Sequence, residues 1–181
     1  MSQRPTDPLL LAGRALTLIM QGFFAFAAVA LTIALPCIWI FSDKIDAKIA
    51  AEFGDAAQAL PLFAISAMMM LGILAVGLAF KFFGKLRQII QTVGEGDPFV
   101  SENADRLTAM AWLLTSVYAT GAAIAGVAIT VLPWIEAMGE SDGNFSVGID
   151  LSAILTIIIL FILARVFRQG AAMREDLEGT I

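Results

Sequence analysis

Residues 61–80 read PLFAISAMMMLGILAVGLAF and contain no charged side chain. A helix rises about 1.5 Å per residue, so twenty helical residues extend roughly 30 Å, the thickness of the hydrocarbon core of a bilayer. The three methionines at 68–70 have no Cys or His nearby, so they indicate apolar packing and not a metal site. The stretch therefore predicts a transmembrane helix.

Three further stretches have the same character. Ala15–Phe41 and Leu107–Ile135 hold 27 and 29 uncharged residues, but only 14 lie between Asp150 and Arg165. The fourth stretch spans a bilayer if Arg165 and Arg168 extend their guanidinium groups to the lipid headgroups. We therefore predict an all-α polytopic membrane protein, a single membrane domain over residues 1–181. Its four transmembrane helices form two helical hairpins, with spans at about 15–41, 61–83, 107–134 and 148–168.

The positions of the basic residues set the expected orientation, because Lys and Arg stay on the cytoplasmic side. Only Lys44 and Lys48 lie between spans one and two. The other nine lie in the N-terminal arm, at the ends of spans two and four, or in the segments that follow these spans. We therefore predict that both termini are cytoplasmic, together with the loop 84–106 and the tail 169–181.

The composition excludes several classes of function. The chain is 59% hydrophobic, with a net charge of −5, which argues against direct binding of nucleic acid. It has no His, a single cysteine (Cys37), and no charged residue deep inside a predicted span. Near-neutral acid–base catalysis and transition-metal sites usually need such groups. We therefore expect no enzyme activity and no catalytic, cofactor or metal site.

Helices are also expected outside the spans. Between spans one and two, Ile45, Ile49 and Phe53 recur every fourth residue, which predicts a short amphipathic helix on the outer surface. After span two, an apolar stripe with basic neighbours predicts a cytoplasmic extension that stops at Gly94 and Gly96. A second extension follows span four and ends acidic, so we expect the basic extension and the acidic tail to pair. The stripe consists of Phe82, Leu86, Ile89 and Val93.

Two segments carry a family resemblance. The first comprises Gly96-Asp97-Pro98-Phe99, Glu102-Asn103-Ala104, Arg106-Leu107 and Trp112, and the second comprises residues 163–170 and 174–181. They resemble the central and C-terminal signatures of domain-of-unknown-function family twenty-nine seventy-five (DUF2975), and the resemblance covers nearly the whole chain. It implies a bacterial inner-membrane protein with four helices and no established activity. It also implies a gene that often lies beside one for a small helix-turn-helix DNA-binding regulator.

Three functional hypotheses follow. The first is a regulatory membrane protein whose cytoplasmic face docks a partner such as that regulator, through Arg87, Asp97, Phe99, Arg106, Arg168, Arg174, Glu175 and Asp176. The second is a small transporter or an immunity factor against membrane-active compounds, which predicts a polar cavity between spans one and three near Pro36 and Pro133. The third is a structural subunit of a larger complex. Small residues in span three, Gly121 to Gly126, favour close helix packing or a homo-oligomer.

Overall fold

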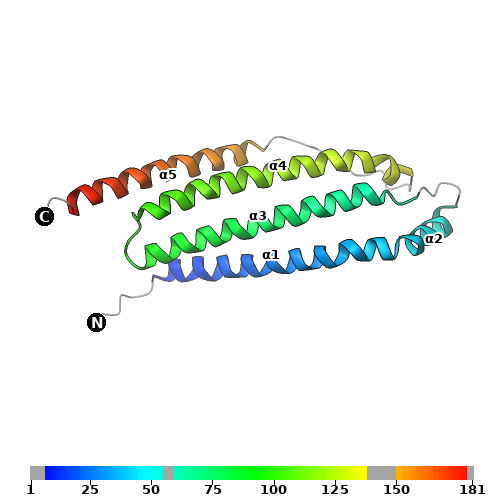
Figure 1. The fold of residues 1–181 in the computed structure, drawn as a ribbon, viewed down its shortest axis with the longest axis horizontal. Coiled ribbons are helices and arrows are strands. Elements are labelled where there is room, and N and C mark those ends of the chain that lie inside the picture. The colour runs from blue at the N-terminus through cyan, green and yellow to red at the C-terminus, as the bar shows by residue number, and fades with distance from the viewer. Residues whose placement is uncertain (1–6, 55–58, 138–149, 179–181) are drawn as a thin grey trace. The chain divides into compact units, whose positions relative to one another are not determined.

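The computed structural model describes residues 7–54, 59–137 and 150–178, which form five helices and no strand. Four of the helices are long and apolar enough to cross a membrane, which confirms the all-α prediction and the number of candidate spans. Figure 1 labels all five helices and colours them from blue at the N-terminus to red at the C-terminus. Their bounds are α1, Pro8–Ile40; α2, Ser42–Phe53; α3, Leu62–Gly94; α4, Ser101–Ala137; and α5, Leu151–Glu178.

Two aspartates begin the long helices at the ends of the chain. The carboxylate of Asp7 accepts a hydrogen bond from the backbone N–H of Leu9 at 3.0 Å, and that of Asp150 accepts one from Ser152 at 2.9 Å. Each carboxylate satisfies a backbone donor that has no partner within the first turn, and it lies at the positive end of the helix dipole. The predicted fourth span therefore has a defined N-terminal cap.

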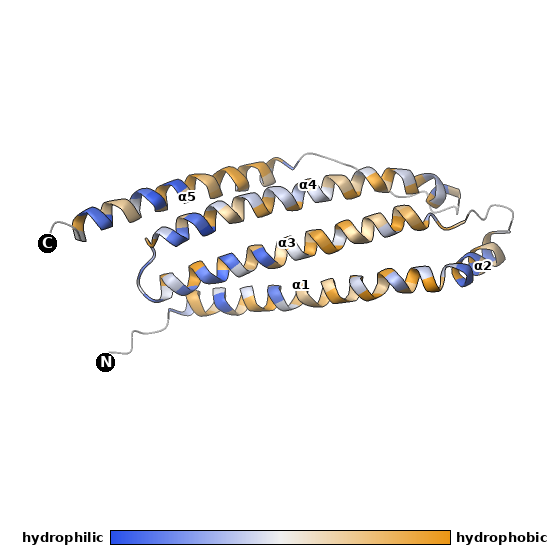
Figure 2. Cartoon of the chain, in the orientation of Figure 1, coloured by the Kyte–Doolittle hydropathy of each residue, from blue (hydrophilic) through white to orange (hydrophobic). Residues whose placement is uncertain are grey.

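The helices extend beyond the uncharged stretches. The first begins at Pro8, seven residues before the predicted span, and α3 continues to Gly94 without interruption. The last helix reaches Glu178, so the residues after spans two and four are helical as the apolar stripe and composition predict. Figure 2 shows hydrophilic residues concentrated in the C-terminal parts of α3 and α5 and in α2.

The short helix α2 confirms the amphipathic pattern between spans one and two. Ile45, Ile49 and Phe53 are half-buried, whereas most of the other side chains of this helix are exposed. The carboxylate of Asp46 accepts a hydrogen bond from the backbone N–H of Leu60 at 2.9 Å. This bond links α2 to the segment that leads into α3.

The described residues divide into two compact units, and every long helix except α5 contributes to both. Unit 1 consists of the described residues within Met1–Ala25, Gly77–Val117 and Asp150–Ile181. Unit 2 consists of those within Phe26–Val76 and Tyr118–Ile149. Unit 1 therefore contains the start of α1, the C-terminal half of α3, the start of α4 and all of α5. It holds all the residues proposed above for partner docking.

Most of the fully buried side chains lie on α4. In unit 1 its first turns bury Asn103, Ala104, Leu107 and Ala111 along one face, at the three- and four-residue spacing of a helix. Large apolar side chains elsewhere face outward, such as Phe26 at 74% exposed and Phe63 at 82%. Outward-facing apolar side chains are what a helix surrounded by lipid requires.

The sequence favours close helix packing or a homo-oligomer at the small residues of span three. Among the described residues, its two glycines do not lie at a close contact with another helix. Side chains added at Gly121 and Gly126 would meet nothing within 4 Å among the described atoms. The small residues that α4 buries are instead Ala104 and Ala111 in unit 1 and Ala128 in unit 2. The homo-oligomer through the glycine face stays a prediction.

Candidate functional site

The turn between α3 and α4 is built by backbone bonding around Gly96. The N–H of Gly96 bonds to the carbonyl of Val93 at 3.1 Å, and the N–H of Asp97 bonds to the carbonyl of Thr92 at 3.1 Å. Gly96 has φ +89°, a conformation that glycine adopts without steric cost. These two bonds form a Schellman motif, which satisfies the last carbonyls of α3 and reverses the chain.

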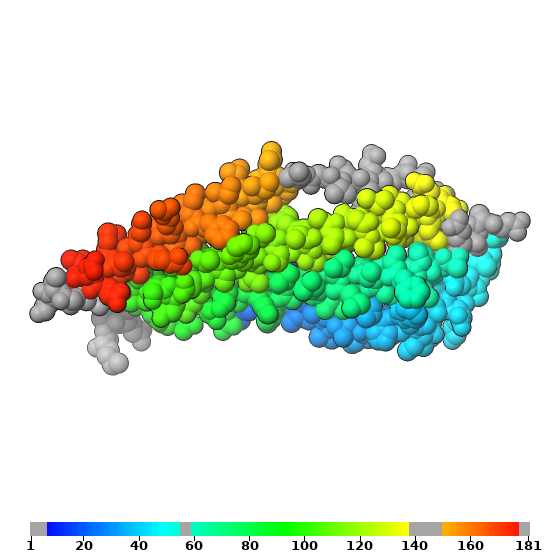
Figure 3. Space-filling view, turned by 45° about the horizontal axis from the view of Figure 1, so that its top comes forward, coloured from blue at the N-terminus to red at the C-terminus, as the bar shows by residue number. Residues whose placement is uncertain are grey.

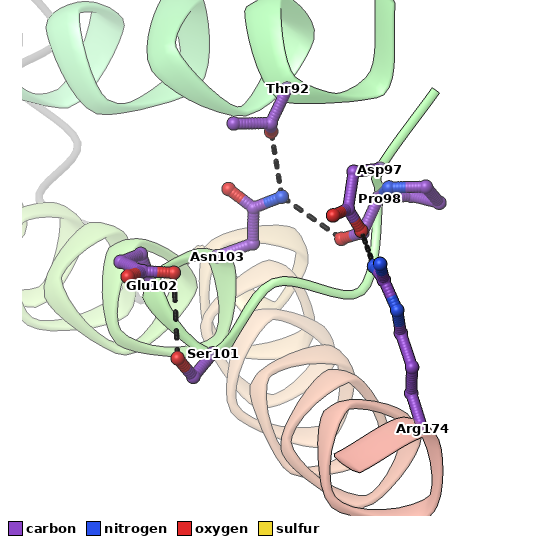
Figure 4. Close-up of polar contacts among 7 residues, drawn as sticks. All are labelled: Thr92, Asp97, Pro98, Ser101, Glu102, Asn103 and Arg174. Carbon is purple, nitrogen blue, oxygen red and sulfur yellow. Dashed lines mark hydrogen bonds and ion pairs between the residues drawn. The ribbon is translucent and has the colours of Figure 1, made fainter. Parts of the chain in front are cut away.

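Asn103 is the central residue of this turn and is fully buried. Its Nδ2 donates to the hydroxyl of Thr92 at 2.7 Å and to the carbonyl of Pro98 at 2.9 Å (Figure 4). Its Oδ1 accepts from Nη1 of Arg106 at 2.7 Å. One amide thus joins the end of α3, the turn and the start of α4, and each of its polar atoms has a partner.

The turn is also attached to α5. A nitrogen of Arg174 donates to the carboxylate of Asp97 in an ion pair (Figure 4). The ring of Phe99 packs against that of Phe167, with centroids 5.3 Å apart. It also lies directly over Gly170, where an added Cβ would come within 2.6 Å of a ring carbon. The absence of a side chain at Gly170 is therefore what lets Phe99 approach α5.

A second ion pair lies between α4 and α5. Nη2 of Arg168 donates to the carboxylate of Asp105 at 3.1 Å, and the ring of Trp112 meets that of Phe161 edge-on. In the space-filling view the red C-terminal part of α5 lies against the green start of α4 (Figure 3). We call the contacts of Asp97, Phe99 and Asp105 with α5 the clasp.

The structure thus brings together five of the eight residues that the sequence proposed for docking. They are Asp97, Phe99, Arg106, Arg168 and Arg174, and all five take part in the clasp or in the bonding of Asn103. Glu175 and Asp176 follow as exposed residues near the end of α5. Arg87 lies elsewhere in unit 1, beside a hollow between α1 and α3.

The two ion pairs have the opposite polarity to the pairing expected from the sequence. The sequence pattern suggested that bases after span two would meet acids of the tail. In the clasp the bases belong to α5 and the acids to the turn and α4, as Asp97–Arg174 and Asp105–Arg168 show. Both pairs are exposed, so each contributes only about 0–1 kcal/mol.

Sequence reasoning missed three residues that hold this site. Asn103, Phe167 and Gly170 lie within the two family signatures, but the sequence assigns no role to any of them. A signal was present for Asn103, since an amide between a turn and an apolar helix often satisfies neighbouring backbone groups. The contact of Gly170 with Phe99 involves residues far apart in sequence, and periodicity carries no information on it.

The comparison with protein families decides the classification. The family described as a protein of unknown function, DUF2975, matches residues 14–181. The chain belongs to DUF2975. This match contains both signatures and the whole clasp, and no enzymatic domain is indicated. No curated protein and no solved structure matches this DUF2975 chain.

The structure has a hollow near Pro36, but it is not the polar cavity between spans one and three that the transporter alternative predicts. A space of about 430 Å³ in unit 2 is lined by α1 and α3, not by α1 and α4, and Pro133 is not among its lining residues. Its polar group is the hydroxyl of Ser66, which accepts a hydrogen bond from the indole of Trp39 at 2.8 Å. An apolar hollow with its hydroxyl engaged gives no support to passage of a polar solute.

Proposed function

We propose that this protein is a non-enzymatic regulator of the bacterial inner membrane, whose folded cytoplasmic end docks a protein partner. The observation that carries the proposal is the clasp. Anchoring alone requires only the apolar stretches, yet α3 and α5 continue beyond them and are fastened together through the turn. Specific contacts between the turn, α4 and α5 are expected if this end of the protein presents a defined surface to a partner.

The distribution of charge supports a protein as the partner. Arg174, Glu175 and Asp176 place both signs of charge within three residues near the end of α5, and all three are exposed. Mixed charges of this kind suit recognition of another protein surface, whereas nucleic acid requires clustered bases. The family resemblance suggests a small helix-turn-helix regulator as that partner. The positive-inside distribution of basic residues supports a cytoplasmic location for this end.

Co-purification of the partner with the full chain, solubilised in mild detergent, tests the proposal. We expect that deleting residues 174–181 abolishes co-purification, because it removes the exposed charges and one side of the clasp. The matched control is Lys48→Glu in α2, which changes an exposed charge in unit 2 and leaves co-purification unchanged. Retention of the same partners by the deletion variant would contradict docking at this end.

A charge exchange separates the fold of the clasp from direct contact with the partner. Asp97→Arg and Arg174→Asp each break the ion pair, and the double variant restores it with reversed polarity. If the partner reads the shape that the clasp fixes, the double variant recovers co-purification and the single variants lose it. If the partner contacts these charges directly, the double variant also fails to bind.

A further inference from the structure

A hollow with charged side chains lies between α1 and α3 in unit 1. It has a volume of about 330 Å³ and is lined by Arg14, Leu18, Arg87, Gln91 and Glu95. Arg87 and Gln91 lie four residues apart on one face of α3, and Glu95 follows directly after the last residue of this helix, with its N–H bonded to the carbonyl of Gln91 at 3.0 Å. The guanidinium of Arg14 reaches the same space from α1.

A glycine of α3 gives Arg14 its position. A Cβ added at Gly94 would lie 2.9 Å from Nη2 of Arg14, and one added at Gly13 would lie 3.2 Å from Cδ1 of Ile90. The two helices therefore approach closely here, and the guanidinium rests against the backbone of α3. Arg14 and Arg87 thus face one hollow from two different helices.

The positive charges in the hollow are not balanced by an ion pair with any residue that the structure describes. Gln91 Nε2 donates to the carboxylate of Glu95 at 3.0 Å, which engages the one acid of the lining. Neither Arg14 nor Arg87 forms a side-chain hydrogen bond or an ion pair with any residue in the described ranges 7–54, 59–137 and 150–178. Two guanidinium groups in this arrangement match the oxygen atoms of a phosphate.

The surroundings indicate that the phosphate is attached to an apolar body. Arg14 directly precedes the uncharged stretch that begins at Ala15. Leu9 and Leu11 before it are 77% and 50% exposed, and Leu18 after it is 50% exposed. A free phosphate would leave these leucines uncovered, whereas a lipid covers them with its acyl chains while its headgroup meets the arginines.

We propose that Arg14 and Arg87 form a binding site for the phosphate group of an anionic phospholipid in the leaflet at the clasp end of the protein. Basic hollows between membrane helices are suited to such headgroups. The carboxylate of Glu95 weakens the binding, and its hydrogen bond from Gln91 limits this effect. This site is separate from the clasp and does not depend on partner docking.

Native mass spectrometry of the full chain in nonionic detergent tests the proposal. Phosphatidylglycerol, phosphatidylcholine and inorganic phosphate are titrated separately, and the bound species are counted. We expect phosphatidylglycerol to bind more tightly than the other two. Arg14→Gln and Arg87→Gln each weaken its binding roughly fivefold, since a basic residue near an anionic surface contributes about that factor.

Two further variants control for overall charge and for folding. Lys48→Gln removes an exposed basic residue of α2 outside the hollow and leaves phosphatidylglycerol binding within twofold of wild type. Glu95→Gln removes the opposing charge and tightens binding, which a misfolded variant would not do. Equal binding of phosphatidylcholine, an equal loss in Lys48→Gln, or no gain in Glu95→Gln would overturn the proposal. Tighter binding of inorganic phosphate would assign the site to a soluble anion instead.

Discussion

At the scale of single residues, Asn103 is the group on which the site most depends. It is fully buried, and its amide serves as donor twice and as acceptor once. A buried amide that makes these bonds stabilises the fold modestly, but loss of its donors leaves the carbonyl of Pro98 without its donor, while Thr92 Oγ1 keeps only its own bond to the carbonyl of Ile89. The asymmetry arises because an unsatisfied buried polar group retains its full cost of desolvation.

Asn103→Asp tests this role with almost no change of shape. The carboxylate still accepts from Arg106 but can no longer donate to Thr92 Oγ1 or to the carbonyl of Pro98. We expect the free energy of unfolding to fall by about 1–3 kcal/mol. Denaturant-induced unfolding in detergent micelles measures it, with Glu102→Gln, an exposed neighbour, as the control. If Asn103→Asp and Glu102→Gln were equally stable, the hydrogen bonds of Asn103 would not be what holds this turn.

At the scale of elements, the contact of Phe99 with α5 can be measured as a coupling. Gly170→Ala places a Cβ within 2.6 Å of the Phe99 ring, and such overpacking costs about 1–3 kcal/mol. In a Phe99→Ala background the obstruction is absent, and alanine then favours the helix by up to about 1 kcal/mol. A double-mutant cycle of unfolding free energies should therefore show strong non-additivity.

The control for this cycle is Gly77→Ala in α3. An added Cβ there meets nothing within 4 Å among the described atoms, so the substitution should be neutral or slightly stabilising in either background. If Gly170→Ala behaves in the same way as Gly77→Ala, the ring does not rest on α5.

The helices themselves were largely predictable. Long uncharged stretches indicate membrane-spanning helices, and the spacing of apolar residues indicates the amphipathic ones. The end of α3 at Gly94 and the turn at Gly96 followed from the two glycines and the Asp97-Pro98 turn, and α2 followed from the spacing of its apolar residues. The contacts between elements were not predictable in the same way. Hydropathy shows that α5 is helical, but not that Arg174 faces Asp97 or that Gly170 faces Phe99, because helix register depends on packing.

At the scale of the whole molecule, the orientation in the membrane decides what the clasp can meet. The proposal requires an even number of crossings, and the shortest uncharged stretch, residues 151–164, is the critical one. Its helix runs from Leu151 to Glu178 and is long enough to cross. If it lay along the surface instead, the end of α5 would be on the outside and the clasp would be divided.

Cysteine labelling with a membrane-impermeant maleimide tests the orientation in a Cys37→Ser background. Asp43→Cys, in α2, should react in intact cells, whereas Glu102→Cys and Glu175→Cys should react only after the membrane is permeabilised, because basic residues retain their segments inside. Comparison of labelling at positions 102 and 175 tests the fourth crossing separately from the others. Protection at 102 together with reaction at 175 in intact cells would show that α5 does not cross, and partner docking at this end would then have to be abandoned.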